Sequence, residues 1–133
     1  MTRVLVTGSR DWPDETTIRQ ALAEVWVRDP DFANAQPCAV PTLVHGDCPT
    51  GADAIADSIA RELGWHVEKY PADWEHLHKA AGPVRNQQMV DAGADACLAF
   101  LMPHSRGTVD CARRAERAGI PVNRWHGHIG ACT

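Results

Sequence analysis

Three short turns in this sequence combine glycine with serine, threonine, arginine or aspartate, residue types that bind anions. They are Gly8-Ser9-Arg10, Gly46-Asp47-Cys48-Pro49-Thr50-Gly51 and Ser105-Arg106-Gly107-Thr108. Glycine lets the backbone come close to a ligand, and the free N–H groups at the start of a following helix attract negative charge. The turns therefore predict a site for a phosphorylated ligand.

The second turn has the Gly-x4-Gly spacing of a Walker A loop but lacks its lysine. Ala52 and Asp53 stand where that motif needs Lys and Ser or Thr. ATP hydrolysis of the P-loop type is therefore not expected. We predict a cradle for a less charged phosphate, with Asp53 free to accept hydrogen bonds from ribose hydroxyls. Alternatively, Asp53 only stabilises the positive end of its helix, by about 0.3–1 kcal/mol.

Three arginines are candidates to reach the same place. Arg10 and Arg106 lie in the turns, and Arg85, followed by Asn86, belongs to the first turn of a helix expected to begin at Gly82-Pro83. Each arginine taken singly could also be a solvated surface residue. Their convergence depends on how the intervening elements are arranged.

Apolar strands and amphipathic helices alternate along the chain. Strands are expected at 3–7, 42–45, 65–70, 96–102 and 120–125, and helices at 14–28, 52–63, 83–92 and 108–118. Residues 29–41 and the region from 72 to the third helix are interpreted as loops. A helix in every crossover predicts an α/β fold, a Rossmann-like doubly wound parallel sheet of about five strands in the order 3-2-1-4-5, with helices on both faces. The three turns then meet near the switch point between strands one and four, where such sheets bind ligands.

The composition is that of one globular domain, expected at 1–125 with a tail at 126–133. The chain of 133 residues is 44% hydrophobic, and its net charge of −4 provides no bulk basic field, so a nucleic-acid partner is not expected. No apolar run is long enough to span a bilayer and no signal peptide precedes the first strand, so cytoplasmic residence is the default expectation. The five scattered cysteines are expected to be free thiols. Because no Cys/His spacing matches a zinc site, no metal and no cofactor are expected.

Four segments resemble the small YspA/YpsA-type branch of the SLOG superfamily. They are GSRDW at 8–12, VHGDCPTGAD at 44–53, the Arg85-Asn86 pair and SRGT at 105–108. The resemblance covers nearly the whole chain except 29–41 and the tail. It implies a Rossmann-like domain that binds nucleotides or nucleotide-derived ligands. The expected ligand-binding residues are Gly8, Ser9, Arg10, Gly46, Asp47, Thr50, Gly51, Asp53, Arg85, Asn86, Ser105, Arg106, Gly107 and Thr108.

The same superfamily includes the LOG phosphoribohydrolases, which cleave the N-glycosidic bond of nucleoside 5′-monophosphates. These enzymes carry PGGxGTxxE and an arginine at the start of a preceding helix, where this chain has Arg85. Here Ser105 replaces a glycine and Cys111 stands at the glutamate position. Asp110 is one residue short, about 100° away around a helix. Because glycosidic cleavage needs a carboxylate, loss of this activity is expected unless Asp110 takes that role with Arg85.

Three functions remain open. The first is a sensor-type module for a small nucleotide-like ligand. The second is a phosphoribohydrolase in which Asp47, Asp53 or Asp110 supplies the carboxylate. The third is an interaction protein with a vestigial site or a DprA-like strand binder, against which the acidic balance argues. A homodimer is also considered, since LOG relatives pair and Trp74 or Trp125 could be interface aromatics.

Overall fold

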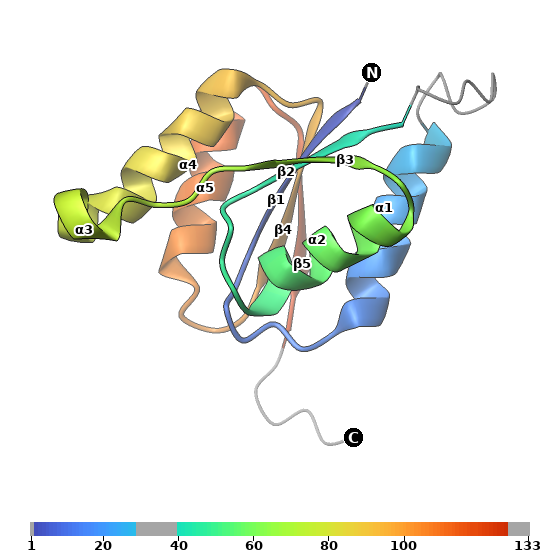
Figure 1. Ribbon diagram of the computed structural model, residues 1–133, viewed down its shortest axis with the longest axis horizontal. Helices are drawn as coiled ribbons and strands as arrows, with labels where there is room; N and C mark the ends of the chain where they lie inside the picture. The colour runs from blue at the N-terminus through green and yellow to red at the C-terminus, as the bar shows by residue number, and fades with distance from the viewer. Residues whose placement is uncertain (1, 29–39, 128–133) are drawn as a thin grey trace.

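The five strands form one parallel sheet. The computed structural model describes residues 2–28 and 40–127 (Figure 1). The strands are β1 (Arg3–Gly8), β2 (Thr42–His45), β3 (His66–Lys69), β4 (Ala96–Leu101) and β5 (Val122–His126), in the order β3-β2-β1-β4-β5. The predicted fold class and strand order are confirmed. The expected loop falls largely on 29–39 and the expected tail on 128–133, outside the described residues.

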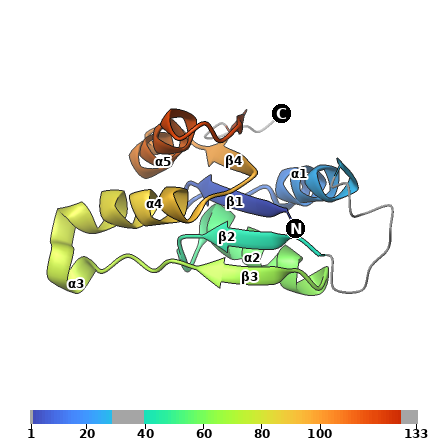
Figure 2. The ribbon, with the colours of Figure 1, turned by 90° about the horizontal axis from the view of Figure 1, so that it is seen from above.

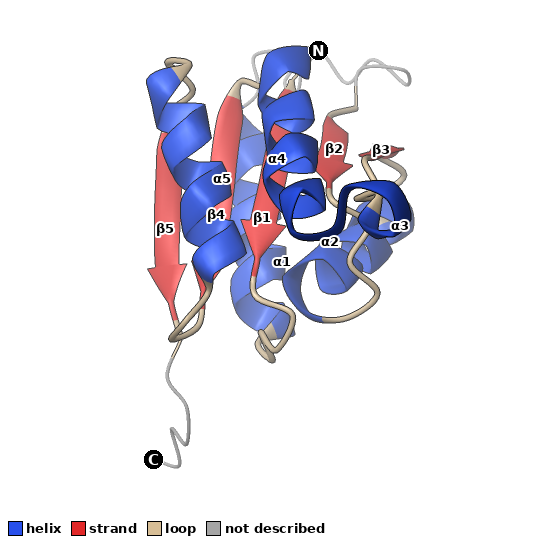
Figure 3. Cartoon of the chain, turned by 90° about the vertical axis from the view of Figure 1, so that its left-hand side faces the viewer, coloured by secondary structure: helices blue, strands red, loops and turns tan. Residues whose placement is uncertain are grey.

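Helices cover both faces of the sheet. α1 (Glu15–Arg28) and α2 (Gly51–Glu62) lie on one face, and α4 (Ala81–Ala92) and α5 (Arg106–Arg117) lie on the other (Figures 2 and 3). Because side chains alternate along a strand, Val4 and Val6 pack against α1 and α2, whereas Leu5 packs against α4 and α5. Burial on both faces explains the nearly continuous apolar runs of β1 and β4.

The loop expected between β3 and the third long helix is helical instead, so that prediction was wrong. It holds the one-turn helix α3 (Trp74–Leu77) and the 3₁₀ turn η2 (His78–Ala80), and α4 begins directly after them at Ala81. The cause is a cap: the Asp73 side chain accepts a hydrogen bond from the His76 N–H at 3.2 Å. Figure 1 shows α3 at the end of an arm that projects from the sheet.

The last strand also begins later than expected. The Ile120 N–H still donates to the Ala115 carbonyl at 2.9 Å, so Ile120 closes the end of α5 and β5 starts at Val122. In β5, Trp125 stacks on Phe100 with ring centroids 4.9 Å apart and planes 15° apart. Trp125 is therefore part of the packing, whereas Trp74 is 49% exposed.

Candidate ligand-binding site

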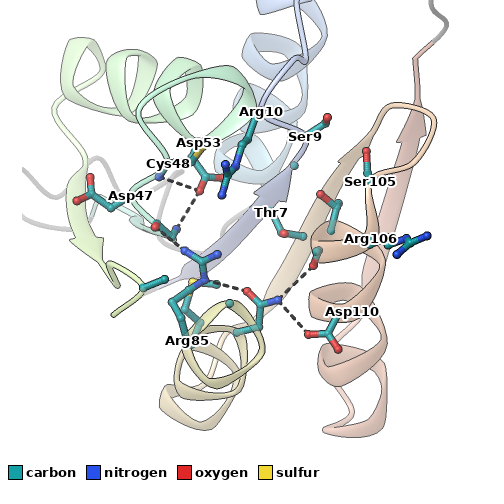
Figure 4. Close-up of a pocket in the computed structure, with 18 of the residues that line it drawn as sticks. Thr7, Ser9, Arg10, Asp47, Cys48, Asp53, Arg85, Ser105, Arg106 and Asp110 are labelled. Carbon is teal, nitrogen blue, oxygen red and sulfur yellow. Dashed lines mark hydrogen bonds between the residues drawn. The ribbon is translucent and has the colours of Figure 1, made fainter. Parts of the chain in front are cut away.

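A cavity of about 790 Å³ lies at the carboxyl ends of the central strands. Its floor comes from the end of β1, and its walls come from the loop after β2, the first turns of α4, and the start of α5 (Figure 4). This is the switch point of the sheet: from β1 the chain continues to β2 and β3 on one side, and it later returns to β4 and β5 on the other side. The cavity thus lies at the edge of the sheet where the sequence predicts a site.

The Gly46–Gly51 turn differs from the anion cradle that its spacing predicts. The Gly46 and Cys48 N–H groups both donate to Oδ2 of Asp53, at 3.2 and 3.4 Å, and the Asp47 N–H donates to Nδ1 of His45 at 3.0 Å. Asp53 and His45 thus supply internal acceptors for the turn, and these three amides are not available to a ligand phosphate. The expected hydrogen bond from a ribose hydroxyl to Asp53 could therefore use only its other oxygen, Oδ1.

Asp53 is buried, with 6% of its surface exposed. Its second oxygen, Oδ1, has no hydrogen-bond partner among the described residues. Burial raises the pKa of this carboxyl above its ordinary value, against the opposing effects of His45, the turn amides and Arg85. The carboxyl therefore takes up protons more readily in the folded protein than in the unfolded chain.

This pKa shift predicts a pH-dependent effect of Asp53→Asn. A raised folded pKa means that the wild-type free energy of unfolding falls as pH rises from about 3.9, the unfolded value, through the folded value. The amide of the Asp53→Asn variant does not ionise and has no such penalty. The stability of this variant relative to wild type should therefore grow with pH over that interval and then level off. Urea unfolding of both proteins from pH 4 to 9 measures the difference.

Asp53→Ala is the matched comparison. It leaves the Gly46 and Cys48 amides without their acceptor, so it should be about 2–4 kcal/mol less stable than Asp53→Asn at every pH, because neither variant ionises at this position. A wild type that gains stability over Asp53→Asn as pH rises would contradict the raised pKa.

His45 and Asp57 stabilise the Gly46–Gly51 turn through hydrogen bonds. Nε2 of His45 lies 2.8 Å from Oδ2 of Asp57, and Asp57 also accepts from Nε of Arg61 at 2.6 Å. His45 is nearly fully buried, and its Nδ1 acts as the acceptor for the Asp47 N–H, which assigns the proton to Nε2. Asp47 needs this support because its backbone is left-handed, with φ of 58°.

A line of hydrogen bonds crosses the cavity from the β2 loop to α5. Nη1 of Arg85 donates to the Gly46 carbonyl at 2.6 Å, and Nε of Arg85 donates to Oδ1 of Asn86 at 2.9 Å. The Asn86 amide then donates to the Gly107 carbonyl at 3.2 Å and to Oδ2 of Asp110 at 3.0 Å. Arg85 and Asn86 therefore join three separate segments around one cavity, as Figure 4 shows.

Asp110 faces this cavity as an ionised group. Burial alone would raise its pKa, but hydrogen bonds from Nε of Arg114, at 2.8 Å, and from Asn86 outweigh burial and hold the pKa below its ordinary value. The sequence placed Asp110 one position short of the LOG-type glutamate. In the structure it lines the cavity beside Asn86.

The first turn of α5 leaves backbone donors open. Ser105 precedes the helix without capping it, because its hydroxyl donates to the Met102 carbonyl at 2.6 Å and accepts from the Met102 N–H at 2.9 Å. In the described part of the chain, the Gly107 and Thr108 N–H groups have no hydrogen-bond acceptor. Gly107 and Thr108 both line the cavity. The start of α5 can therefore bind an anion through its free N–H groups, whereas the Gly46 and Cys48 N–H groups already donate to Asp53.

The three arginines do not converge on one point. Arg85 lies in the cavity, whereas the Arg10 guanidinium sits 5.7 Å from the ring centroid of Trp74. Figure 4 shows Arg106 pointing away from Arg85, toward the outer side of α5. Arg10, Arg85 and Arg106 thus all line the same cavity, but their guanidinium groups do not form a single cluster.

Most of the predicted binding residues line the cavity. The exceptions are Thr50 and Gly51: Thr50 is exposed at the start of α2, and Gly51 packs under the Ser9-Arg10 backbone. Sequence reasoning missed lining residues from the end of β1, the loop after β2, the arm, α4 and the turn before α5, namely Val6, Thr7, Cys48, Pro49, Pro71, Ala72, Trp74, Gly82, Pro83, Met89 and His104. The Asp73 cap was the available signal for the arm that carries Trp74.

Comparison with known proteins identifies the family. The model of the YspA, cpYpsA-related SLOG family matches residues 2–77, which is more than half of the 133 residues. The chain belongs to this SLOG family. The matched span runs from β1 to α3 and includes the Gly8 and Gly46–Gly51 turns. The Gene 61 protein of Mycobacterium phage D29 is 48% identical over 127 residues, covering 92% of this chain and 94% of the phage protein.

In this SLOG-family chain, the residue at the LOG glutamate position is a core residue. Cys111 is fully buried, and burial raises the pKa of its thiol to about 11. A thiol that stays protonated at neutral pH is a poor nucleophile. Cys111 is therefore a small residue of the core rather than a reacting group.

The described residues contain neither a cluster of metal ligands nor a membrane-spanning helix. Over residues 2–28 and 40–127, no three His, Cys, Asp or Glu side chains gather closely enough to hold a metal ion. In that same part of the chain, no helix is both long and apolar enough to cross a bilayer.

Proposed function

We propose that this SLOG-family protein binds a nucleotide or a nucleotide-derived phosphorylated ligand, as a sensor-type module. The observation that carries the proposal is the start of α5, where Gly107 and Thr108 line a cavity of about 790 Å³ and their N–H groups have no acceptor in the described residues. That volume lies within the range of about 300–1,000 Å³ typical of small-molecule sites.

The other walls of the cavity suit the remaining parts of such a ligand. Asp110, Asn86 and Arg85 offer an acceptor and donors for a sugar next to the phosphate. Trp74, with the Arg10 guanidinium over its ring, offers a flat apolar surface for a base. Family membership supports the same ligand class.

A ligand screen with one variant tests this proposal. Thermal midpoints are measured with AMP, ADP-ribose, cyclic ADP-ribose, NAD and ribose 5-phosphate, where ligand at 100 times Kd stabilises by about 2.7 kcal/mol. Gly107→Ala should keep the fold, because a Cβ at Gly107 meets no atom within 4 Å. Its methyl group would lie beside the Gly107 N–H and hinder the approach of a phosphate, so affinity should fall about tenfold or more. No shift with any ligand, or equal affinity of both proteins, would overturn the proposed site.

One observation favours hydrolysis as the second candidate. Asp110 is ionised, faces the cavity and is oriented by Asn86. A carboxylate so placed can stabilise oxocarbenium-like charge or position water. Chromatography of each incubated nucleotide tests this: release of free base that stops in Asp110→Asn, with ligand binding retained, would establish the phosphoribohydrolase alternative.

A further inference from the structure

A second cavity lies against the first, on the outer side of α5. Its volume is about 610 Å³, and it is bounded by the end of β4, the end of β5 and one face of α5. Four residues line both cavities: His104, Ser105, Arg106 and Asp110. The two cavities therefore meet around the start of α5, next to the open Gly107 and Thr108 amides.

This second cavity is called the groove below. Three arginines of α5 line one wall of it. Arg106, Arg113 and Arg117 are spaced by seven and four residues, which places them within about 40° of one another around the helix. All three are exposed. The ion pairs of α5 instead join Arg114 to Asp110 and Glu116 to Arg124. Among the described residues, the three groove arginines have no carboxylate within ion-pair distance.

The groove is positively charged in a chain whose net charge is −4. His104 and His126 also line it, and its acidic residue is Asp110. The Asp110 charge is already matched, because Oδ2 accepts from Arg114 at 2.8 Å and from Asn86 at 3.0 Å. The unmatched arginines leave the groove suited to an anion, and guanidinium groups bind phosphate oxygens in bidentate geometry.

We propose that this groove binds a second phosphoryl group of the ligand. The ligand would then be a nucleotide with a phosphate chain or with two separate phosphates, rather than a nucleoside monophosphate. This inference rests on the proposed function: the first phosphate lies at the start of α5, and the second lies farther along the helix. Arg113 is about 10 Å from Arg106 along the helix axis, so the ligand extends past Arg106 to reach it.

A small ligand is favoured over a nucleic-acid strand for two reasons. The unmatched arginines occupy one face of one helix, about 16 Å from end to end. The rest of the chain is net acidic and would repel a longer polyanion. The groove also shares four lining residues with the first cavity at the α5 start, a short distance that a small ligand can span.

Calorimetric titration tests the inference with AMP, adenosine 3′,5′-bisphosphate and ATP. The proteins are wild type, Arg113→Gln/Arg117→Gln, and the control Arg28→Gln, whose residue is exposed at the far end of α1. We expect the better of the two multiply phosphorylated ligands to bind at least tenfold more tightly than AMP in wild type and control. In the double variant this ratio should fall to near one.

Each other outcome is decisive. If AMP binds but neither multiply phosphorylated ligand binds more tightly than AMP, the inference fails while the proposed function stands. If the tighter binding of these ligands persists in the double variant, the inference also fails. If no nucleotide binds, both fail. If an octathymidylate strand binds more tightly than every nucleotide and this depends on Arg113 and Arg117, the groove serves nucleic acid and the present assignment is wrong.

Discussion

Gly51→Ala is expected to lower the free energy of unfolding by about 2–4 kcal/mol. Gly51 has φ of 72°, a conformation that costs a residue with a Cβ about 1–2 kcal/mol. A Cβ there would also lie 2.2 Å from the Ser9 carbonyl oxygen and 2.5 Å from the Arg10 carbonyl carbon. These are backbone atoms that cannot rotate away, so the β1 turn or the start of α2 must shift. Chemical denaturation at pH 7 measures the loss.

Gly64→Ala is the matched control. Gly64 has φ of 80°, but a Cβ there meets no atom within 4 Å. Its cost should therefore be the conformational part alone, about 1–2 kcal/mol. If the two variants were equally stable, the close approach of the Ser9-Arg10 backbone to α2 would not contribute, and the packing of the first two turns described above would be incorrect.

Arg85→Met is expected to weaken nucleotide binding by about 100-fold, since hydrogen bonds from a charged donor contribute about 1.5–3 kcal/mol each. Methionine keeps much of the length of arginine but has no donor. The Gly46 carbonyl and the Asn86 side chain would both lose a partner, at 2.6 and 2.9 Å respectively. Asn86 would then no longer be held in place to orient Asp110. Titration with the nucleotide that gives the largest thermal shift measures the effect.

Two comparison variants separate charge from geometry in this prediction. Arg85→Lys keeps the charge but cannot bridge Gly46 and Asn86 at once, so it should lose nearly as much affinity as Arg85→Met. Arg28→Met, at an exposed position on α1, should leave affinity within twofold. Full affinity in Arg85→Lys would mean that only the charge matters and that the line of hydrogen bonds across the cavity does not.

Local patterns in the sequence were sufficient to predict the framework. The apolar runs at 3–7 and 42–45 and the helical stripe from Ala52 to Leu63 depend on neighbours in the chain, and the structure confirms these elements. The arm was missed because one turn of helix has no periodicity to detect. Its signal was a single cap, Asp73, which a reading by hydrophobic pattern passes over.

Residue types and spacing were enough to predict the family and the strand order, and they place the proposed site at the edge of the sheet that holds the cavity. They also placed nearly all the glycines, arginines and aspartates that line the cavity. Which of these groups remain available to a ligand depends on the packing. The Gly46–Gly51 turn has the spacing of an anion cradle, yet its amides donate to Asp53 and His45. Arg106, in contrast, is available at a place that its spacing does not predict, because it lines the outer groove as well as the first cavity. The physical reason is that spacing along a chain sets which groups are neighbours, whereas the direction of an N–H bond and the burial of a carboxylate depend on how separate elements pack.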